Sequence, residues 1–486
     1  MAGGVAPVSG GSSNVGDGKN YSGALAIVTT LFFMWGFITC LNDILIPKFR
    51  EHFDLDGVQA MMVQFCFFTA YFIISLIYYI ISISQGDPIA KFGYKKAIIT
   101  GLVIAGIGCG IFYPAAVIES YGLFLFALFI LASGITILQM GANPYVTLLG
   151  DAKGASSRLN MTQAFNSLGT TIAPILGGAF ILDACAEDLG LETVKGPYIA
   201  LAAMLIGLAI MIKVAKLPSI DVEENQVKGI GAHKYPHLIL GVVCIFMYVG
   251  GEVSIGSYII NFLGLENIAG LPTHEADRYL SFYWGGAMIG RFFGSVFLDE
   301  NTDISKNTVK LTLIFVLSYT LALFLANKAI IHSMIQPNSC EHVLPWDITT
   351  PLIFSSIVLL NCLCFFLGKN KAGLTLGVFA LVVVGALLIG ITFNGSIAMW
   401  AILSIGLFNS IMFPTIFTLA IKGLGVDTGQ GSSLLIMAIV GGALIPPIQG
   451  FAEKGLGIQG SFIIPLICYL YIGYYGFIGS KPKQIS

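Results

Sequence analysis

Two carboxylates stand inside long apolar runs of this sequence, Asp43 in "GFITCLNDILIPKF" and Glu252 in "IFMYVGGEVS". A carboxylate in a membrane-spanning segment is costly, and such groups commonly serve an ion or proton pathway. A carboxyl group in an apolar cavity can exchange a proton near neutral pH. Structural roles are the alternatives: Asp43 paired at the interface with Lys48 or Arg50, and Glu252 held in a structural hydrogen bond.

Amide side chains at helical spacing form a second candidate set. Gln139 and Asn143 are four residues apart, and Gln163 and Asn166 are three apart, so each pair shares a helix face. Amides offer hydrogen-bond donors and acceptors together, as a neutral polyhydroxylated solute requires. For each amide the alternative is a structural bond between helices, worth about 0.6–2 kcal/mol. The further candidates for lining such a site are Asn42, Asn261, Asn409, Trp35 and Trp284.

Basic and metal-binding residues are scarce inside the apolar runs. Arg291 is the one deeply placed cation, and we expect it to extend to the interface or to pair with Asp299. The six His lie in loops or at segment ends, and the nine Cys are scattered without a CxxC pair. This pattern argues against a metal centre and a disulfide framework. No GxxxxGK[ST] loop and no catalytic carboxylate cluster stands in the sequence, which argues against an ATP-driven pump and an enzyme.

The overall composition is that of a polytopic membrane protein. Of the 486 residues, 56% are hydrophobic and 10% are charged, with a mean hydropathy of +0.86. A soluble domain has about 25% charged residues. No basic cluster indicates a nucleic-acid partner, and no feature indicates a cofactor or an obligate protein partner. The expected partners are the lipid bilayer and a small solute.

Fourteen apolar runs approach the length of about 20 residues that a membrane-spanning helix needs, and the short run 352–367 leaves twelve or thirteen open. Lys and Arg are concentrated in alternate loops, which predicts that both termini are cytoplasmic. The expected organisation is a disordered cytoplasmic tail at 1–23, a six-helix half at 24–215, a cytoplasmic linker at 216–237 and a second half at 238–480. The predicted helices are 24–47, 60–85, 97–117, 121–143, 160–182, 198–215, 238–263, 280–298, 309–331, 352–367, 374–393, 397–421, 431–450 and 460–478.

The two halves carry related motifs. "FFMWGFITCLND" at 32–43 and "IFMYVGGEVS" at 245–254 occupy the same place in each half, as do "LQMGANPYVTLLG" at 138–150 and "LFNSIMFPTIFTLA" at 407–420. Internal repeats of this kind are typical of transporters that bind a solute between two halves. On this alignment the second half contains an inserted helix pair near 309–367, which leaves the orientation of the later helices unchanged.

Longer motifs resemble a known family. The loop "GDPIAKFGYKK" at 86–96 partly matches the signature G-x-x-x-D-[RK]-x-G-x-[RK]-[RK] of the major facilitator superfamily, with Ala90 at the Asp position. From about residue 31 to 481 the chain resembles the fucose–galactose–glucose–proton symporter family, its bacterial glucose/galactose branch above all, with N-acetylglucosamine permeases nearby. The resemblance implies an all-α major facilitator fold and alternating access. The stretches that carry it include "LNDILIP", "GANPYVTLLG", "RLNMTQAFNSLGTTIAP", "EVSIGSYIINFLG", "YWGGAMIGRFFGS" and "LFNSIMFPTIFTLAIKGLG".

The same resemblance implies roles for several residues. Asp43 matches the helix 1 Asp of an Asn-Asp-Ile motif that contacts sugar and takes part in proton coupling. Gln163 and Asn166 match the Gln and Asn of "QxFNS" that line the sugar site. The family's second coupling carboxylate, a Glu on helix 4, is replaced here by Gln139, which cannot titrate. Coupling is then left to Asp43 alone, to Asp43 with Glu252, or to sodium in place of the proton.

These observations predict a secondary active transporter of a bacterial inner membrane. It would import a neutral monosaccharide of the glucose/galactose type by cation symport, with no cofactor and with a proton or sodium as the coupling ion. An N-acetylglucosamine or fucose permease of the same fold is the nearest alternative. A multi-span membrane enzyme or a receptor is disfavoured, because the catalytic motifs are missing and a receptor does not need a two-half repeat.

Overall fold

The computed structural model describes residues 21–55, 57–181, 191–218, 229, 231–271, 273–299, 307–327 and 346–482. These residues form helices and the turns between them, with no strand in the described ranges. Helices satisfy their own backbone hydrogen bonds, which is the requirement for crossing a bilayer. Most of the expected tail at 1–23 and half of the linker at 216–237 lie outside the described residues.

The described part of the first half contains six long helices and one short helix, and each long helix lies close to a predicted run. The short helix α3 (Pro88–Phe92) separates α2 from α4. Asp87 begins α3 by accepting a hydrogen bond of 2.9 Å from the Ile89 backbone N–H. Gly93 turns the chain into α4 at a φ of +85°, which favours glycine. The long helices are α1 (Ser22–His52), α2 (Gly57–Gln85), α4 (Tyr94–Ile118), α5 (Tyr121–Leu148), α6 (Ala155–Ile181) and α7 (Glu192–Val214).

The second half contributes eight long helical segments, so the described residues contain fourteen and agree with the predicted number. Eleven of the described segments are by themselves long and apolar enough to cross a membrane. Two of these segments are interrupted, one between α14 and α15 and the other between α16 and α17. The second-half helices are α8 (Pro236–Leu263), α9 (Thr273–Phe297), α10 (Thr308–Ala326), α12 (Thr349–Gly368), α13 (Ala372–Thr392), α14 (Gly395–Asn409), α15 (Met412–Ala420), α16 (Thr428–Met437), α17 (Gly441–Ser461) and α18 (Ile463–Tyr474).

The two halves use the same close helix crossing. On α6, a Cβ added to Gly169 would lie 2.2 Å from the Phe33 carbonyl oxygen of α1. On α17, a Cβ added to Gly441 would lie 2.1 Å from the Phe246 carbonyl oxygen of α8. Phe33 and Phe246 occupy the same position in the two repeated motifs. The internal repeat seen in the sequence is therefore present as a repeated packing contact.

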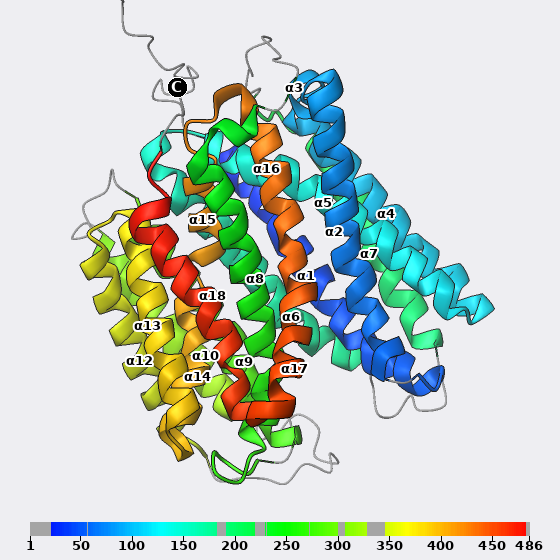
Figure 1. Ribbon diagram of the computed structural model, residues 1–486. Helices are drawn as coiled ribbons and strands as arrows, with labels where there is room; N and C mark the ends of the chain where they lie inside the picture. The colour runs from blue at the N-terminus through cyan, green and yellow to red at the C-terminus, as the bar shows by residue number, and fades with distance from the viewer. Residues whose placement is uncertain are drawn as a thin grey trace, which may run out of the picture.

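Helices α10 and α12 lie outside this repeat. In the first half α4 packs against α5 and α7, and in the second half α13 packs in the same way against α14 and α18. By contrast, α10 packs against α9 and α12. The pair stands at the edge of the second half, beside α13 (Figure 1). This packing fits the expected insertion near 309–367, of which residues 328–345 lie outside the described ranges.

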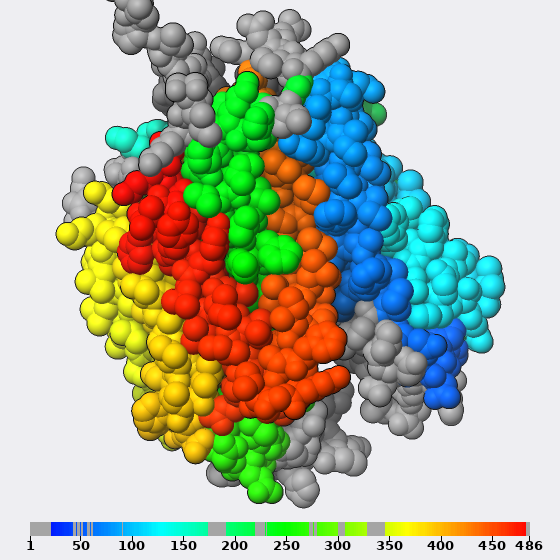
Figure 2. Space-filling model, in the orientation of Figure 1, coloured from blue at the N-terminus to red at the C-terminus, as the bar shows by residue number. Residues whose placement is uncertain are grey.

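The halves meet at the end of the molecule where α3 lies, here called the α3 end. The hydroxyls of Ser156 on α6 and Thr418 on α15 are 2.8 Å apart, and Ser157 donates to the Ser295 carbonyl of α9. Ser432 of α16 donates to the Met140 carbonyl of α5 at 3.4 Å. Figure 2 shows the halves in contact in its upper part, at the α3 end, and a gap beside α17 lower down.

Candidate functional site

Glu252 lies on α8 within a group of hydroxyl donors. The Tyr248 hydroxyl, one helical turn earlier, donates to Oε1 of Glu252 at 2.7 Å. The Tyr283 hydroxyl of α9 donates to the Glu252 backbone carbonyl at 3.2 Å. Glu252 is partly buried, and both tyrosines are fully buried. The carboxylate expected from sequence is thus held by hydrogen bonds at a fixed place inside the second half.

Asn409 joins the same group from the break between α14 and α15. Its amide nitrogen donates to the Tyr283 hydroxyl at 2.8 Å, and its Oδ1 accepts from the Tyr469 hydroxyl of α18 at 2.6 Å. Its backbone carbonyl lies 3.2 Å from the Tyr248 hydroxyl. In this conformation the amide of Asn409 is used to join helices. Together Glu252, Asn409, Tyr248, Tyr283 and Tyr469 are called the Glu252 network below.

Gln139 lies on α5 of the first half, with its side chain buried. Its amide nitrogen donates to the Tyr71 hydroxyl of α2 at 2.7 Å, whereas its Oε1 has no protein partner. Trp35 of α1 is partly buried. Trp35 also packs against Phe32, with ring centroids 5.5 Å apart. Gln139 therefore joins α5 to α2 and keeps one acceptor unused.

Further amide atoms in the first half are buried without a protein partner. Neither the nitrogen nor the oxygen of the Asn143 amide has one, and Asn143 is fully buried. The Gln163 amide nitrogen and the Asn160 Oδ1 are in the same condition. Leaving a buried polar group unsatisfied costs about 1–3 kcal/mol. Such groups in a folded protein therefore point to a ligand, to water or to another conformation in which they are paired.

Asn166 is used differently from Asn143. Its amide nitrogen donates to the Phe32 carbonyl of α1 at 2.9 Å. It lies at the crossing of α1 and α6, where a Cβ added to Gly36 would lie 2.1 Å from the Asn166 carbonyl oxygen. The donor of Asn166 is thus engaged in the bond between helices that was the structural alternative for this residue.

Arg291 of α9 does not reach the interface and does not pair with Asp299, so that expectation was wrong. Its side chain is buried, and its Nε donates to the Ser410 carbonyl at 2.9 Å. That carbonyl has no intrahelical donor, because the residue four positions later is Pro414. A second guanidinium nitrogen donates to the Ser167 hydroxyl and, at 3.4 Å, to the Gln163 carbonyl, both on α6 of the other half.

The remaining predicted residues lie apart from these groups or outside the description. Asn261 is exposed near the end of α8, nine residues beyond Glu252 and so about 13 Å along the axis. Trp284 of α9 packs on α8, where a Cβ added to Gly256 would lie 3.1 Å from its ring. Asn42 and Asp43 belong to α1, but their side chains lie outside the described part of the chain.

Sequence reasoning missed the tyrosines that position the polar groups. Only Tyr248 carries a sequence signal, because it precedes Glu252 by four residues and so shares its helix face. Tyr71, Tyr283 and Tyr469 reach their partners from other helices. Partners that are distant in sequence leave no local pattern.

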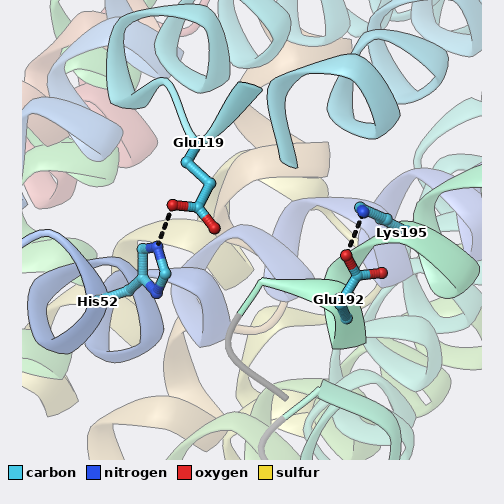
Figure 3. A network of polar contacts seen from close by, with 4 residues as sticks. All are labelled: His52, Glu119, Glu192 and Lys195. Carbon is cyan, nitrogen blue, oxygen red and sulfur yellow. Dashed lines mark hydrogen bonds and ion pairs between the residues drawn. The ribbon is translucent and has the colours of Figure 1, made fainter. Parts of the chain in front are cut away.

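Charged pairs are found away from this interior. Within the described residues the ion pairs are His52 with Glu119 at 3.8 Å and Glu192 with Lys195 (Figure 3). They lie where α1 and α4 end and α7 begins, at the opposite end from α3. The described residues contain no group of three His, Cys, Asp or Glu side chains that could hold a metal.

In the described residues, fourteen long helical segments in two repeat-related halves, with buried polar groups where the halves meet, define a polytopic membrane protein of the two-half transporter type. The model of the Major Facilitator Superfamily matches residues 24–336. The chain belongs to the major facilitator superfamily.

Individual relatives agree with this assignment. A glucose/galactose transporter of Brucella abortus biovar 1 (strain 9-941) is 43% identical over 472 residues, which cover 95% of each chain. An L-fucose-proton symporter of Escherichia coli (strain K12) is 29% identical, with 94% of this chain and 93% of that protein covered. The crystal structure of FucP, a major facilitator transporter in the outward conformation, superposes with a TM-score of 0.71 at 28% identity, over 95% of this chain and all of that one. These relatives are transporters or symporters, so the chain is a transporter rather than an enzyme.

Proposed function

We propose that this protein imports a neutral hexose of the glucose/galactose type together with a proton. The observation that carries the proposal is the set of buried first-half amides without protein partners, formed by Asn143, Oε1 of Gln139 and the amide nitrogen of Gln163. Hydroxyl groups of a sugar both donate and accept hydrogen bonds, and this set offers both. The glucose/galactose transporter with 43% identity supports the choice of sugar.

Among the residues that the structure describes, the Glu252 network is the candidate for proton coupling. The carboxylate has a hydroxyl donor at 2.7 Å, and the other members of the network are neutral, so a single proton changes the charge of the network. Asp43 of α1 is the second candidate. The E. coli relative is a proton symporter, which favours the proton over sodium for this chain. No cofactor or protein partner is needed for such a mechanism.

The orientation of the protein in the membrane is inferred from the positions of its basic residues. Lys91, Lys95 and Lys96 lie at the α3 end, and basic loops remain on the cytoplasmic side. With both termini cytoplasmic in a bacterial inner membrane, the halves touch at the cytoplasmic side. A sugar would then enter from the outside, and rocking of the halves about the polar interior would release it inside.

Uptake by purified protein in liposomes tests this proposal. We expect labelled glucose or galactose to accumulate under an inward proton gradient, and not under a sodium gradient alone. Fucose and N-acetylglucosamine serve as competing substrates, and preferential accumulation of either would replace the hexose assignment with that permease. Accumulation of none of the four sugars under either gradient would remove the sugar-symporter proposal.

The role of Asp43 needs a second measurement. Counterflow exchanges labelled for unlabelled sugar without net proton movement, so it reports binding and rocking alone. We expect Asp43→Asn to retain counterflow and to lose accumulation. Retained accumulation would show that Asp43 is not required for coupling, and loss of both activities would assign it to sugar binding.

A further inference from the structure

Arg291 joins the two halves through neutral acceptors. It is buried on α9 of the second half and is held within that half by the Ser410 carbonyl, which Pro414 leaves free. Its other bonds go to Ser167 and to the carbonyl of Gln163 on α6. The ring of Phe165 on α6 meets that of Phe292 on α9 edge-on, with centroids 5.9 Å apart. The guanidinium thus lies in a packed contact between α6 and α9.

Among the described side chains, no carboxylate forms an ion pair with Arg291. The ion pairs among the described residues are His52–Glu119 and Glu192–Lys195, and neither includes it. A buried cation without a counter-ion is costly, and removing water strengthens its interaction with any nearby negative charge. Glu252 is linked to Arg291 by a short chain of contacts: its partner Tyr248 also lies 3.2 Å from the Asn409 carbonyl, and the next carbonyl, that of Ser410, binds Arg291. Ionised Glu252 therefore attracts Arg291 away from acceptors that are neutral.

Among the described residues around the Glu252 network, Arg291 is the cation, bonded to the Ser410 carbonyl that follows Asn409. The titratable groups of the network itself are the hydroxyls of Tyr248 of α8, Tyr283 of α9 and Tyr469 of α18. Helices α14, α15 and α16 carry no ionisable residue. On α17, Glu453 bonds to Tyr258 at 3.0 Å, six residues and so about 9 Å further along α8.

We propose that Arg291 is a positioning residue of the transport cycle, which transmits the charge of Glu252 to α6 and so to Gln163 and Asn166. This rests on the proposed proton symport. When Glu252 is protonated, Arg291 stays bonded to Ser167 and Gln163 and the halves remain joined at α6 and α9. When Glu252 is ionised, its attraction for Arg291 competes with those bonds and weakens the contact. The proton-loaded protein without sugar is thereby kept from changing conformation, which prevents an uncoupled proton leak.

A distance measurement without sugar tests the inference independently of the transport assay. Spin labels at Lys153 and Lys422, both exposed at the α3 end, report the separation of the halves there. Labels attached through unnatural amino acids leave the native cysteines in place. In liposomes from about pH 5.5 to about pH 8, a range in which buried carboxyls can titrate, we expect the separated population to grow at high pH. Loss of the two hydrogen bonds from Arg291 to Ser167 and Gln163 would shift the ratio of separated to joined molecules about tenfold.

Variants assign that change to Arg291 and Glu252. Arg291→Gln and Glu252→Gln are each expected to remove the pH dependence, and the double variant to behave like either one. Arg291→Lys keeps the charge and should keep part of the dependence. Arg291→Gln should also admit protons into sugar-free liposomes. A pH dependence that survives in either single variant to Gln would overturn the inference.

A conservative pair guards against misfolding of the Arg291 variants. Ser167→Ala removes one acceptor of Arg291, whereas Ser157→Ala removes a bond between α6 and α9 that does not involve Arg291. We expect the first to reduce the pH dependence and the second to leave it unchanged. If Ser167→Ala and Ser157→Ala change the pH dependence equally, Arg291 is only one of several structural contacts between α6 and α9, and the inference fails. If the parent shows this pH dependence but no sugar uptake, the proposed function fails and the link between Glu252 and Arg291 stands.

Discussion

The Tyr248 hydroxyl lies 2.7 Å from Oε1 of Glu252 and 3.2 Å from the Asn409 backbone carbonyl. A tyrosine has a single hydroxyl proton to donate, and its oxygen can also accept a bond. When Glu252 is ionised, that proton serves the carboxylate. When Glu252 is protonated, the carboxyl group can donate to Tyr248, whose own proton then serves the Asn409 carbonyl. Both charge states of Glu252 therefore find partners in one arrangement of helices.

This relationship predicts that the Glu252→Gln variant still exchanges sugar across the membrane but no longer accumulates it against a gradient. Glutamine keeps the shape and an acceptor for Tyr248 but cannot gain or lose a proton. We expect counterflow of labelled galactose to continue, whereas proton-driven uptake stops when the inside and outside concentrations are equal. Glu453→Gln on α17 is the matched control and should accumulate sugar as the parent does. Uphill accumulation by Glu252→Gln would assign coupling to Asp43 alone.

Tyr248→Phe is predicted to shift the pH profile of uptake. The phenol stabilises ionised Glu252 by a charge-assisted bond worth about 1.5–3 kcal/mol. Without it the proton is harder to remove, so the alkaline limb of the profile should move to higher pH by about one unit or more. Tyr319→Phe on α10, in the added helix pair, is the control. A profile unchanged in Tyr248→Phe would mean that Glu252 does not titrate in the cycle.

The two kinds of buried amide predict different costs of removal. Asn166→Ala removes the bond to the Phe32 carbonyl and should lower stability by about 0.6–2 kcal/mol. Asn143 makes no bond within the protein, so Asn143→Ala should cost less, because deleting an unsatisfied amide offsets the lost packing. Thermal unfolding in detergent measures the difference, and sugar-dependent protection measures binding. A stability loss in Asn143→Ala equal to that in Asn166→Ala, with sugar protection intact, would make Asn143 structural.

The repeated helix crossing predicts equivalent sensitivity in both halves. A methyl group at Gly169 or Gly441 would lie about 2 Å from a backbone carbonyl oxygen, so the helices would have to separate. We expect Gly169→Ala and Gly441→Ala each to lower stability by about 1–3 kcal/mol or to prevent assembly. Gly207→Ala on α7, where nothing lies within 4 Å of the added Cβ, should be neutral. Tolerance of either crossing variant in thermal unfolding would contradict the observed approach.

The hydropathy of the sequence predicted the number and positions of the long helices. The fourteen predicted apolar runs correspond to fourteen long helical segments in the described residues, because a helix that faces lipid must be apolar along its own local sequence. The repeated motifs around Phe33 and Phe246 predicted the internal repeat, which the structure shows as equivalent helix crossings of α6 on α1 and of α17 on α8. The choice of Glu252 and of the amides as interior polar groups also followed from the sequence, since each stands out in an apolar run.

The sequence by itself determined which residues would be polar inside the membrane, and only the tertiary structure decided what each one contacts. Asn409 and Asn166 are engaged with other helices, Asn143 has no protein partner, and Arg291 bridges the halves where the sequence favoured a path to the interface. The physical reason is the range of the interactions. Burial in lipid is read from neighbouring residues, whereas a hydrogen bond such as that from Arg291 to Ser167 depends on the packing of helices more than one hundred residues apart.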